Sequence, residues 1–401
     1  MKAKSSKSEI NMVVKEKKSL VSFLQCSGCN KSYSVNELQT FADCDQCGKS
    51  PLVAHYDLSE GFGKDEINQK ERSMWRYQGM LPVLDEANIV TLGEGWTPML
   101  HADRLSEKYG MRELLIKDES ANPTGSFKAR GLSMAVSKAK ELGVACCIVP
   151  TAGNAGGALS AYCAKAGMKA IVVMPSHTPD AFKKECRYFG AELIEVDGLI
   201  SDCAKKVAEI KLTTSCFDVS TMKEPYRLEG KKTMGYEIAE QLNWKLPDVI
   251  LYPTGGGTGL IGMWKAFHEM KELGWITGPF PRMIAVQSAN CDPIVQVLEG
   301  RLDTVKNYKG SPTFANGLAV PTPFAEKMIL NVLRESKGTA IAISDDAIKI
   351  AMKEIASLEG LLVCPEGAAL LPALKSLLDR GEIESSESVL MLNTGSAYKY
   401  L

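Results

Sequence analysis

Short runs of apolar, β-branched residues alternate with helical patterns from about residue 112 onward. Strands are predicted at 114–117, 144–150, 169–175, 191–196, 248–253, 282–287 and 388–393. Helices with apolar residues recurring on one face are predicted between them, among them 126–142, 155–166 and 180–189. This alternation is typical of parallel sheets covered by helices on both faces. The predicted fold class is therefore α/β, and the length favours two α/β lobes with a cleft between them.

Composition and charge exclude several classes of protein. The 401 residues are 45% apolar and 24% charged, the ordinary balance of a globular protein, and the net charge is −1. There is no basic excess for binding nucleic acid or a membrane surface, no apolar run near the ~20 residues of a membrane span, and no signal peptide. The first eighteen residues carry six lysines. They predict a disordered tail, with a targeting or nucleic-acid-binding arm as the alternative.

Twelve cysteines fall into two groups. Cys26 and Cys29 form one CxxC pair and Cys44 and Cys47 another, a spacing that predicts a structural zinc ribbon or a metal-free module of the same shape. Gly28 and Gly48 allow the two turns to close tightly. The other eight cysteines are scattered, mostly in apolar surroundings, which is unlike a secreted disulfide framework and fits a reducing cytoplasm.

The first of three loops that follow predicted strands, here called the lysine loop, spans residues 122–130 and reads Asn-Pro-Thr-Gly-Ser-Phe-Lys-Ala-Arg. Pro123 and Gly125 predict a turn, and Ser126 is suited to cap the following helix. Lys128 then lies in the first turn of that helix, where the helix dipole lowers the pKa of an amine and favours its action as a nucleophile. By themselves the residues fit a solvated surface lysine equally well.

Two further loops suit a ligand. The asparagine loop, 151–157 (Thr-Ala-Gly-Asn-Ala-Gly-Gly), lets the backbone approach a flat ligand or a carboxylate, unless Asn154 merely completes a tight turn. The glycine loop, 254–260 (Thr-Gly-Gly-Gly-Thr-Gly-Leu), exposes successive N–H groups and predicts a phosphate site. Residues 257–262 also match the dinucleotide pattern GxGxxG, so an NAD enzyme is an alternative. The next strand ends at Gln287 rather than at the acidic residue that would hold a ribose.

Together these motifs resemble the fold-type II pyridoxal-phosphate enzymes, which have the tryptophan synthase β-like fold, and the threonine synthase family most closely. The segments that carry the resemblance occur in that family's order: 93–98 (Gly-Glu-Gly-Trp-Thr-Pro), the lysine and asparagine loops, 227–233 (Arg-Leu-Glu-Gly-Lys-Lys-Thr) and 393–396 (Asn-Thr-Gly-Ser). The CxxC pairs are also similar to the start of many members. The resemblance covers roughly residues 24–401.

The resemblance implies a role for each loop. Lys128 would hold pyridoxal phosphate as a Schiff base, Asn154 would hydrogen-bond its ring hydroxyl, and Thr394 would meet its pyridine nitrogen. The cofactor phosphate would be cradled by Gly255, Gly256, Gly257, Thr258 and Gly259. Threonine synthases convert O-phosphohomoserine and water to threonine and phosphate. A substrate phosphate is therefore expected to be bound by Arg227, together with Lys117 and Lys231. The substrate carboxylate is expected to be bound by Thr151 and Asn154. Surface ion pairing is the alternative for the three cations.

The resemblance also implies domains and leaves alternatives open. The expected division is a tail at 1–20, a zinc-ribbon-like module at 21–60, a large cofactor-binding domain at 61–131 and 223–401, and a small α/β domain at 132–222. Ala129 and the glycine loop are also similar to dehydratases, so β-elimination from serine or threonine, or a β-replacement, is the alternative reaction. A non-enzymatic interaction protein on the same scaffold is a further alternative. The expected partner is a small phosphorylated amino acid, and the expected assembly is a homodimer.

Overall fold

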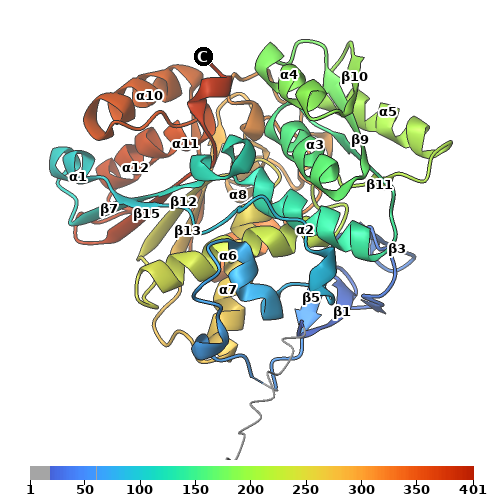
Figure 1. The fold of residues 1–401 in the computed structure, drawn as a ribbon. Helices are drawn as coiled ribbons and strands as arrows, with labels where there is room; N and C mark the ends of the chain where they lie inside the picture. Colours follow the sequence, from blue (N-terminus) through green and yellow to red (C-terminus); the bar gives the residue numbers. More distant parts are fainter. Residues whose placement is uncertain (1–18, 60) are drawn as a thin grey trace, which may run out of the picture.

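The structure is a computed structural model that describes residues 19–59 and 61–401. Most of the predicted lysine-rich tail, residues 1–18, lies outside the described residues. Figure 1 shows a large parallel sheet with its helices on the left, a smaller sheet at the upper right, and a small β module at the lower right.

The large sheet has six strands in the order β14-β13-β12-β15-β7-β6, all parallel to their neighbours except β6. Its strands are β6 (Met99–His101), β7 (Glu113–Asp118), β12 (Val249–Pro253), β13 (Arg282–Ser288), β14 (Thr339–Ile343) and β15 (Ser388–Asn393). Successive side chains of a strand point to opposite faces of the sheet. Because both sets are apolar here, both faces of the sheet are apolar. On β7, Leu115 joins the core under one set of helices, whereas Leu114 and Ile116 join the core under the other.

Helices cover both faces of this sheet. One face packs against α6 (Tyr226–Gln241), α7 (Thr258–Glu272) and α9 (Glu326–Glu335), and the other against α1 (Asp103–Tyr109), α10 (Asp345–Glu359) and α12 (Leu370–Asp379). Two short helices also pack around this sheet, α8 (Pro293–Leu298) and α11 (Pro365–Ala368). The 3₁₀ helices are η1 (Lys64–Glu66), η2 (Met74–Met80), η3 (Glu86–Asn88), η4 (Glu119–Ala121), η5 (Pro123–Gly125), η6 (Val305–Asn307), η7 (Asn316–Leu318) and η8 (Ala397–Lys399).

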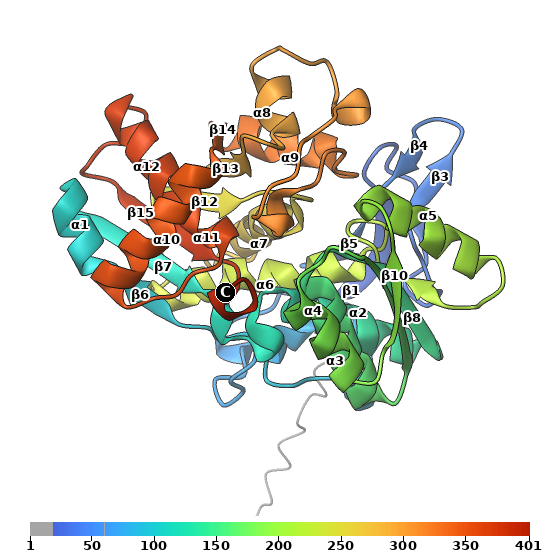
Figure 2. The same cartoon turned by 90° about the horizontal axis from the view of Figure 1, so that it is seen from above.

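The smaller sheet has four parallel strands in the order β10-β9-β8-β11, seen at the right of Figure 2. The strands are β8 (Cys146–Pro150), β9 (Lys169–Pro175), β10 (Glu192–Val196) and β11 (Phe217–Asp218). Helices α2 (Lys128–Glu141), α3 (Asn154–Ala166) and α4 (Asp180–Tyr188) share a core with one face, and α5 (Ile200–Lys211) covers the other. Helix α2 also contacts α6, so it joins the two halves of the molecule.

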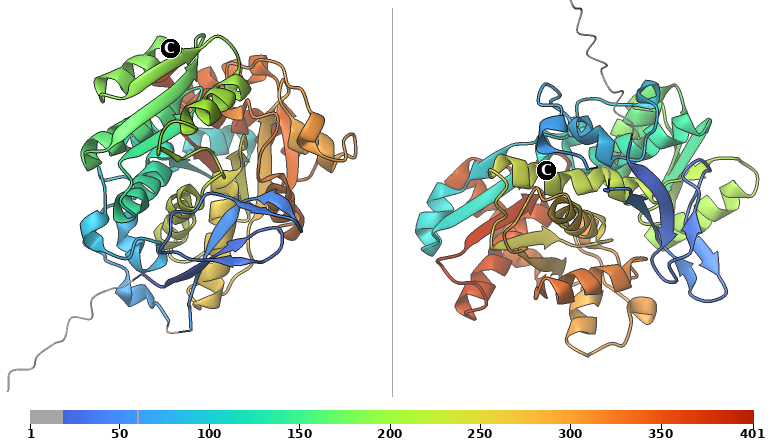
Figure 3. Two further views of the ribbon diagram at one scale, coloured as in Figure 1. Left: turned by 90° about the vertical axis from the view of Figure 1, so that its right-hand side faces the viewer. Right: turned by 90° about the horizontal axis from the view of Figure 1, so that it is seen from below.

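The N-terminal module is built from antiparallel strands, drawn in dark blue in Figure 3. They are β1 (Val21–Cys26), β2 (Ser32–Tyr33), β3 (Ala42–Cys44), β4 (Gly48–Ser50) and β5 (Leu52–Tyr56). Its buried residues Leu24, Leu52 and Ala54 belong to the same core as α2 and α3. The module is therefore packed onto the rest of the protein.

The predicted strands and helices are found within about two residues of their expected ends, and the α/β class is correct. Within the two larger sheets, three strands were not predicted, β6, β11 and β14, and the five short strands of the N-terminal module were not predicted individually either. The scattered cysteines also gave no sign that Cys146 and Cys216 are joined by a disulfide, which ties β8 to the residue before β11. Among the described residues, no helix combines the length and apolar character needed to cross a membrane.

Candidate functional site

Lys128 is the first residue of α2, as predicted, and it is partly buried. Burial lowers the pKa of its amine to about 8, and the positive charge of Arg227 adds to this effect. Desolvation is therefore the main cause of the lowered pKa and a neighbouring cation the second, whereas the loop sequence pointed to the helix dipole. Ser126 does not cap the helix as expected: Phe127 is the N-cap residue, and the buried Ser126 Oγ has no hydrogen-bond partner among the described residues.

The lysine loop is held in a strained shape by the segment that follows β15. Thr124 and Gly125 both have positive φ angles, 60° and 64°, and a β-branched residue such as threonine rarely adopts this region. The backbone N–H of Phe127 donates to the carbonyl oxygen of Thr394 (3.1 Å), and that of Ser396 donates to the carbonyl oxygen of Gly125 (2.9 Å). These bonds bring Thr394 beside Lys128, two residues that lie far apart in the sequence.

The asparagine loop reaches the same region from the smaller sheet. Asn154 is the first residue of α3, and the Oγ1 of Thr151 accepts a hydrogen bond from the N–H of Gly153 (3.1 Å). The amide nitrogen of Asn154 faces Gly395, since a Cβ placed on that glycine would lie 3.6 Å from Nδ2. Asn154 and Thr394 therefore lie close to one another, as predicted residues of one site should.

The glycine loop turns from β12 into α7. Gly257 is the N-cap residue and has a φ angle of +73°, which favours glycine. At Gly255 a side chain is excluded, because its Cβ would come within 2.2 Å of the carbonyl oxygen of Gly317. The buried Oγ1 of Thr258 has no hydrogen-bond partner among the described residues. A helix N-terminus with a buried, unpartnered hydroxyl is a suitable site for a phosphate.

Three cations, here called the cation cluster, gather at this site: Lys128, Arg227 and Lys231. Both lysine side chains contact the ring of Phe127, at 4.3 and 4.7 Å from its centroid. Burial, followed by the charges of Lys128 and Arg227, brings the pKa of Lys231 well below its usual value. A nearby carboxylate, Glu224, accepts from the N–H of Arg227 at the start of α6, and burial raises its pKa to about 7.

Arg227 is almost fully buried but only partly paired. Its Nη1 donates to the carbonyl oxygen of Val219 (2.6 Å) and lies 3.5 Å from the Oγ1 of Thr221. Its Nε and Nη2 are buried and have no hydrogen-bond partner within the described part of the chain. Unpaired buried guanidinium nitrogens are costly, so this arrangement favours a bound anion.

Lys117 does not join the cation cluster. Its ammonium is buried and donates to the Glu237 carboxylate (3.0 Å), the Thr97 carbonyl oxygen (2.8 Å) and the Gln241 side chain (2.7 Å). These bonds use all three of its N–H donors. Arg130 pairs with the same Glu237, which completes a buried ion-pair network. The expectation that Lys117 binds a substrate phosphate therefore does not fit its surroundings.

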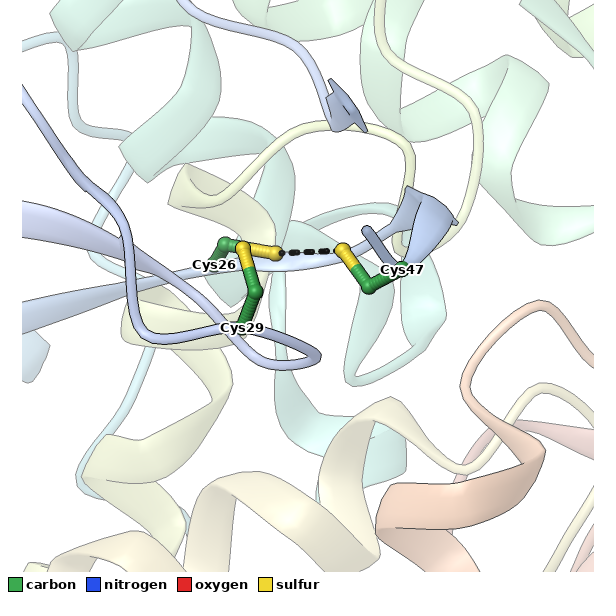
Figure 4. A group of neighbouring side chains, drawn as sticks. All are labelled: Cys26, Cys29 and Cys47. Atoms are coloured by element: carbon green, nitrogen blue, oxygen red, sulfur yellow. Dashed lines mark hydrogen bonds between the residues drawn. The ribbon is translucent and has the colours of Figure 1, made fainter. Parts of the chain in front are cut away.

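The four ribbon cysteines lie together, and Figure 4 shows three of them pointing toward one another. The sulfurs of Cys26, Cys29 and Cys47 all lie within 4.8 Å of each other. The Cys44 sulfur is 2.9 Å from that of Cys47 and 3.6 Å from that of Cys29. Zinc–sulfur bonds of about 2.3 Å in a tetrahedron separate the sulfurs by about 3.8 Å. The group of Cys26, Cys29 and Cys47 is compatible with a zinc ion, whereas Cys44 lies closer to Cys47 than such a tetrahedron requires. A side chain at Gly28 would collide with Cys47, whose Cβ would lie 2.8 Å from the added Cβ.

Comparison with known proteins identifies the family. Residues 90–395 match the pyridoxal-phosphate dependent enzymes. The chain belongs to this family. It is 33% identical over 377 residues to threonine synthase of Methanocaldococcus jannaschii, covering 94% of this chain and 92% of that relative. It is 35% identical to threonine synthase of Methanosarcina acetivorans, with the same coverage.

Solved structures of other proteins share the fold. Diaminopropionate ammonia lyase from Escherichia coli superimposes with a TM-score of 0.65 at 18% identity, over 85% of this chain and 93% of that one. Maize serine racemase superimposes with a TM-score of 0.63 at 22% identity, over 75% and 88%. These likenesses show the fold, and the predicted fold-type II class and its cofactor, pyridoxal phosphate, are confirmed.

The residues of the site fit that cofactor. The unpartnered hydroxyl of Thr258 and the glycine loop are suited to its phosphate, and Lys128 supplies an amine of lowered pKa. Sequence reasoning missed Glu366 and Lys399. The charge of Glu366 acts on Lys128, and Lys399 donates to Asn154. Neither lies in a recognisable motif, although Lys399 follows Thr394 by only five residues.

Proposed function

We propose that the protein is a threonine synthase, a lyase that converts O-phosphohomoserine and water to L-threonine and phosphate. Threonine synthases of two archaea are more than 30% identical to it over nearly its whole length. The single observation that carries the substrate assignment is the buried Arg227, whose Nε and Nη2 lack partners among the described residues. A reaction on serine or threonine, which carry no phosphate, gives such a group no role.

The cofactor would be held by residues from three loops. Lys128 would bind it covalently through its amine, and Asn154 would donate to its ring oxygen. The N–H groups of residues 255–259 and the hydroxyl of Thr258 would receive its phosphate, and Thr394 would meet its pyridine nitrogen. Pyridoxal phosphate supplies a sink for the electrons released when a proton leaves the substrate α-carbon.

Lys128 would then act as the proton carrier. In its free form, its amine would take and return protons at the α-, β- and γ-carbons of the substrate. This role needs a lysine that is neutral for part of the time, and a pKa of about 8 provides it near neutral pH. Water adds at the β-carbon after phosphate has left from the γ-carbon.

Arg227 and Lys231 would bind that leaving phosphate. The two free nitrogens of Arg227 are suited to a bidentate contact with phosphate oxygens, and Lys231 adds a second positive charge on the same helix. Thr151, with Asn154, would receive the substrate carboxylate. Glu224 would keep Arg227 in place through the backbone of α6.

The assay compares two reactions. Phosphate release from O-phosphohomoserine is measured beside the formation of 2-oxo acids from serine and threonine, together with the absorption spectrum of the holoenzyme. Equal amounts of threonine and phosphate, and loss of the bound-cofactor band in a Lys128→Ala variant, are expected. Ammonia and a 2-oxo acid as the main products would favour the dehydratase alternative instead.

We also propose that Cys26, Cys29, Cys44 and Cys47 bind a structural zinc ion. Four thiolates leave no open coordination position, so the ion would stabilise the module and take no part in the reaction. Metal analysis should find about one zinc per chain in the wild type and much less in a Cys26→Ser, Cys47→Ser variant. Wild-type protein without zinc would reject the proposal.

The remaining expectations are proposals of the same kind. We propose a homodimer, because two-fold assemblies are the commonest, and light scattering would test it. The near-neutral net charge supports the absence of a nucleic-acid partner. We propose a cytoplasmic location. The ten free cysteines among the described residues support it, whereas the disulfide between Cys146 and Cys216 does not. The domain division at 21–60, 61–131 with 223–401, and 132–222 follows the two sheets and the β module.

A further inference from the structure

The short helix η8 lies where the two halves of the protein meet over the site. The end of the chain is found between α11 and α4 in Figure 2. Within η8, the ammonium of Lys399 donates to both carboxylate oxygens of Glu185 on α4, at 2.8 and 2.7 Å. It also donates to the carbonyl oxygen of Thr124 in the strained lysine loop, at 2.7 Å. One side chain thus links the large lobe, the smaller sheet's helices and the loop that carries Lys128.

A further contact of Lys399 reaches the cofactor residue Asn154. The ammonium lies 3.2 Å from Asn154 Oδ1, so the oxygen end of this amide is occupied by a donor. The nitrogen end then faces Gly395, next to Thr394, and also contacts the Tyr400 hydroxyl. An amide has two ends of opposite hydrogen-bonding character, and its partners decide which end faces a ligand.

The smaller sheet's helices are shaped to allow this bridge. A Cβ on Gly157 of α3 would lie 1.9 Å from the Oε2 of Glu185, so only glycine leaves room for that carboxylate. The ring of Tyr400, the next residue after Lys399, packs edge-on against Phe182 of α4, with centroids 5.4 Å apart. Gly157 is the last residue of the asparagine loop, so the space for Glu185 is a second reason for a glycine there, besides the approach of the loop backbone to a ligand.

We propose that Lys399 is a positioning residue that fixes the polarity of the Asn154 amide, so that Nδ2 is presented as a donor to the cofactor's ring oxygen. The proposal rests on the proposed cofactor role of Asn154, though not on the choice of substrate. Without the ammonium, the Tyr400 hydroxyl still contacts the amide, but a hydroxyl can donate as well as accept and so does not fix its polarity. The amide can then turn and present Oδ1, an acceptor, to an oxygen that carries negative charge. Because Lys399 also pairs with Glu185 of α4, the proposal links the packing of α4 to how well the site binds the cofactor.

The test uses the full chain, freed of cofactor and titrated with pyridoxal phosphate. The variants are Lys399→Met, Lys399→Arg, Asn154→Ala and the double variant Lys399→Met, Asn154→Ala. Lys353→Met is the matched control, because Lys353 is an exposed lysine of α10. The readouts are the dissociation constant of the cofactor, the absorption and emission spectrum of the bound cofactor, and the urea midpoint of the apo-protein.

The expected result is coupling between the two residues. Lys399→Met should weaken cofactor binding about 10-fold, the usual effect of a lost charged hydrogen bond, and change the spectrum as Asn154→Ala does. Lys399→Arg should restore most of both properties. The double variant should resemble Asn154→Ala, because without the amide there is nothing for Lys399 to orient. Lys353→Met should match the wild type.

Two outcomes would overturn the proposal. Additive losses in the double variant would mean that Lys399 acts independently of Asn154. A lower urea midpoint with an unchanged spectrum would mean that Lys399 is only a structural bridge between η8 and α4. Failure of the proposed function is distinguishable, because wild-type protein that binds the cofactor but forms no threonine leaves the coupling intact.

Discussion

The lowered pKa of Lys128 gives the most direct test of the site. At pH 7.5 an amine with a pKa of about 8 is about one quarter neutral, whereas an ordinary lysine is about 0.1% neutral. Only the neutral amine attacks the aldehyde of pyridoxal phosphate. Lys128 should therefore react about 200 times faster at pH 7.5 than the same amine with an ordinary pKa.

The assay follows the absorbance change when pyridoxal phosphate is added to apo-protein between pH 6 and pH 11. The second-order rate constant should rise with pH and level off above about pH 8. N-α-acetyllysine, measured in the same buffers, corrects for ionisation of the aldehyde's own groups and should continue to rise toward pH 10.4. An Arg227→Gln variant should shift the protein's midpoint upward, because the charge of Arg227 lowers the pKa of Lys128.

Stability gives an independent check with a defined sign. The pKa of Lys128 is lower in the folded than in the unfolded state, so its charge destabilises the apo-protein at neutral pH. The free energy of unfolding contributed by this group should rise between about pH 8 and pH 10.4. Lys128→Met should remove that rise and stabilise the apo-protein at pH 7. A rate that rises only near pH 10, or a midpoint that Arg227→Gln shifts downward, would refute the reasoning.

Three further predictions test other parts of the structure. Arg227→Met should lower kcat/KM for O-phosphohomoserine about 10- to 100-fold in steady-state assays while the cofactor still binds, and an unchanged value would contradict its role. Lys117→Met should lower the free energy of unfolding in urea by about 3 kcal/mol, because Glu237 loses a buried partner, but should alter kcat/KM less than Arg227→Met does. Cys216→Ala should lower the free energy of unfolding by about 2–4 kcal/mol, a loss that reductant should reproduce only in the wild type.

Sequence patterns predicted the features that depend on neighbouring residues. The parallel strands were found because both faces of each strand are buried, which gives continuous apolar runs. The three loops were found because glycines and a helix start lie together in the sequence. Strand β14 was missed although its residues 340–343 are apolar, and β11 is only two residues long. A strand this short is defined by its neighbour β8 rather than by its own sequence.

Contacts between distant segments could not be predicted in the same way. Nothing near Lys399 in the sequence indicates that it meets Glu185 and Asn154, which lie 214 and 245 residues away. The disulfide between Cys146 and Cys216 spans 70 residues and brings an edge strand to the sheet. Such pairs depend on how the lobes pack, and single-sequence periodicity carries no information on that packing.

The lysines of the chain show why residue type alone does not assign a role. Lys117 and Lys231 were both expected to bind a substrate phosphate, and both are almost fully buried. Lys117 is surrounded by acceptors that use all of its N–H donors, so it remains ion-paired with Glu237. Lys231 instead faces Lys128 and Arg227, and burial together with their charges brings its pKa well below the usual value. Cations held close together in this way are stabilised by a bound anion, so the cluster's unfavourable electrostatics are themselves evidence for the ligand it binds.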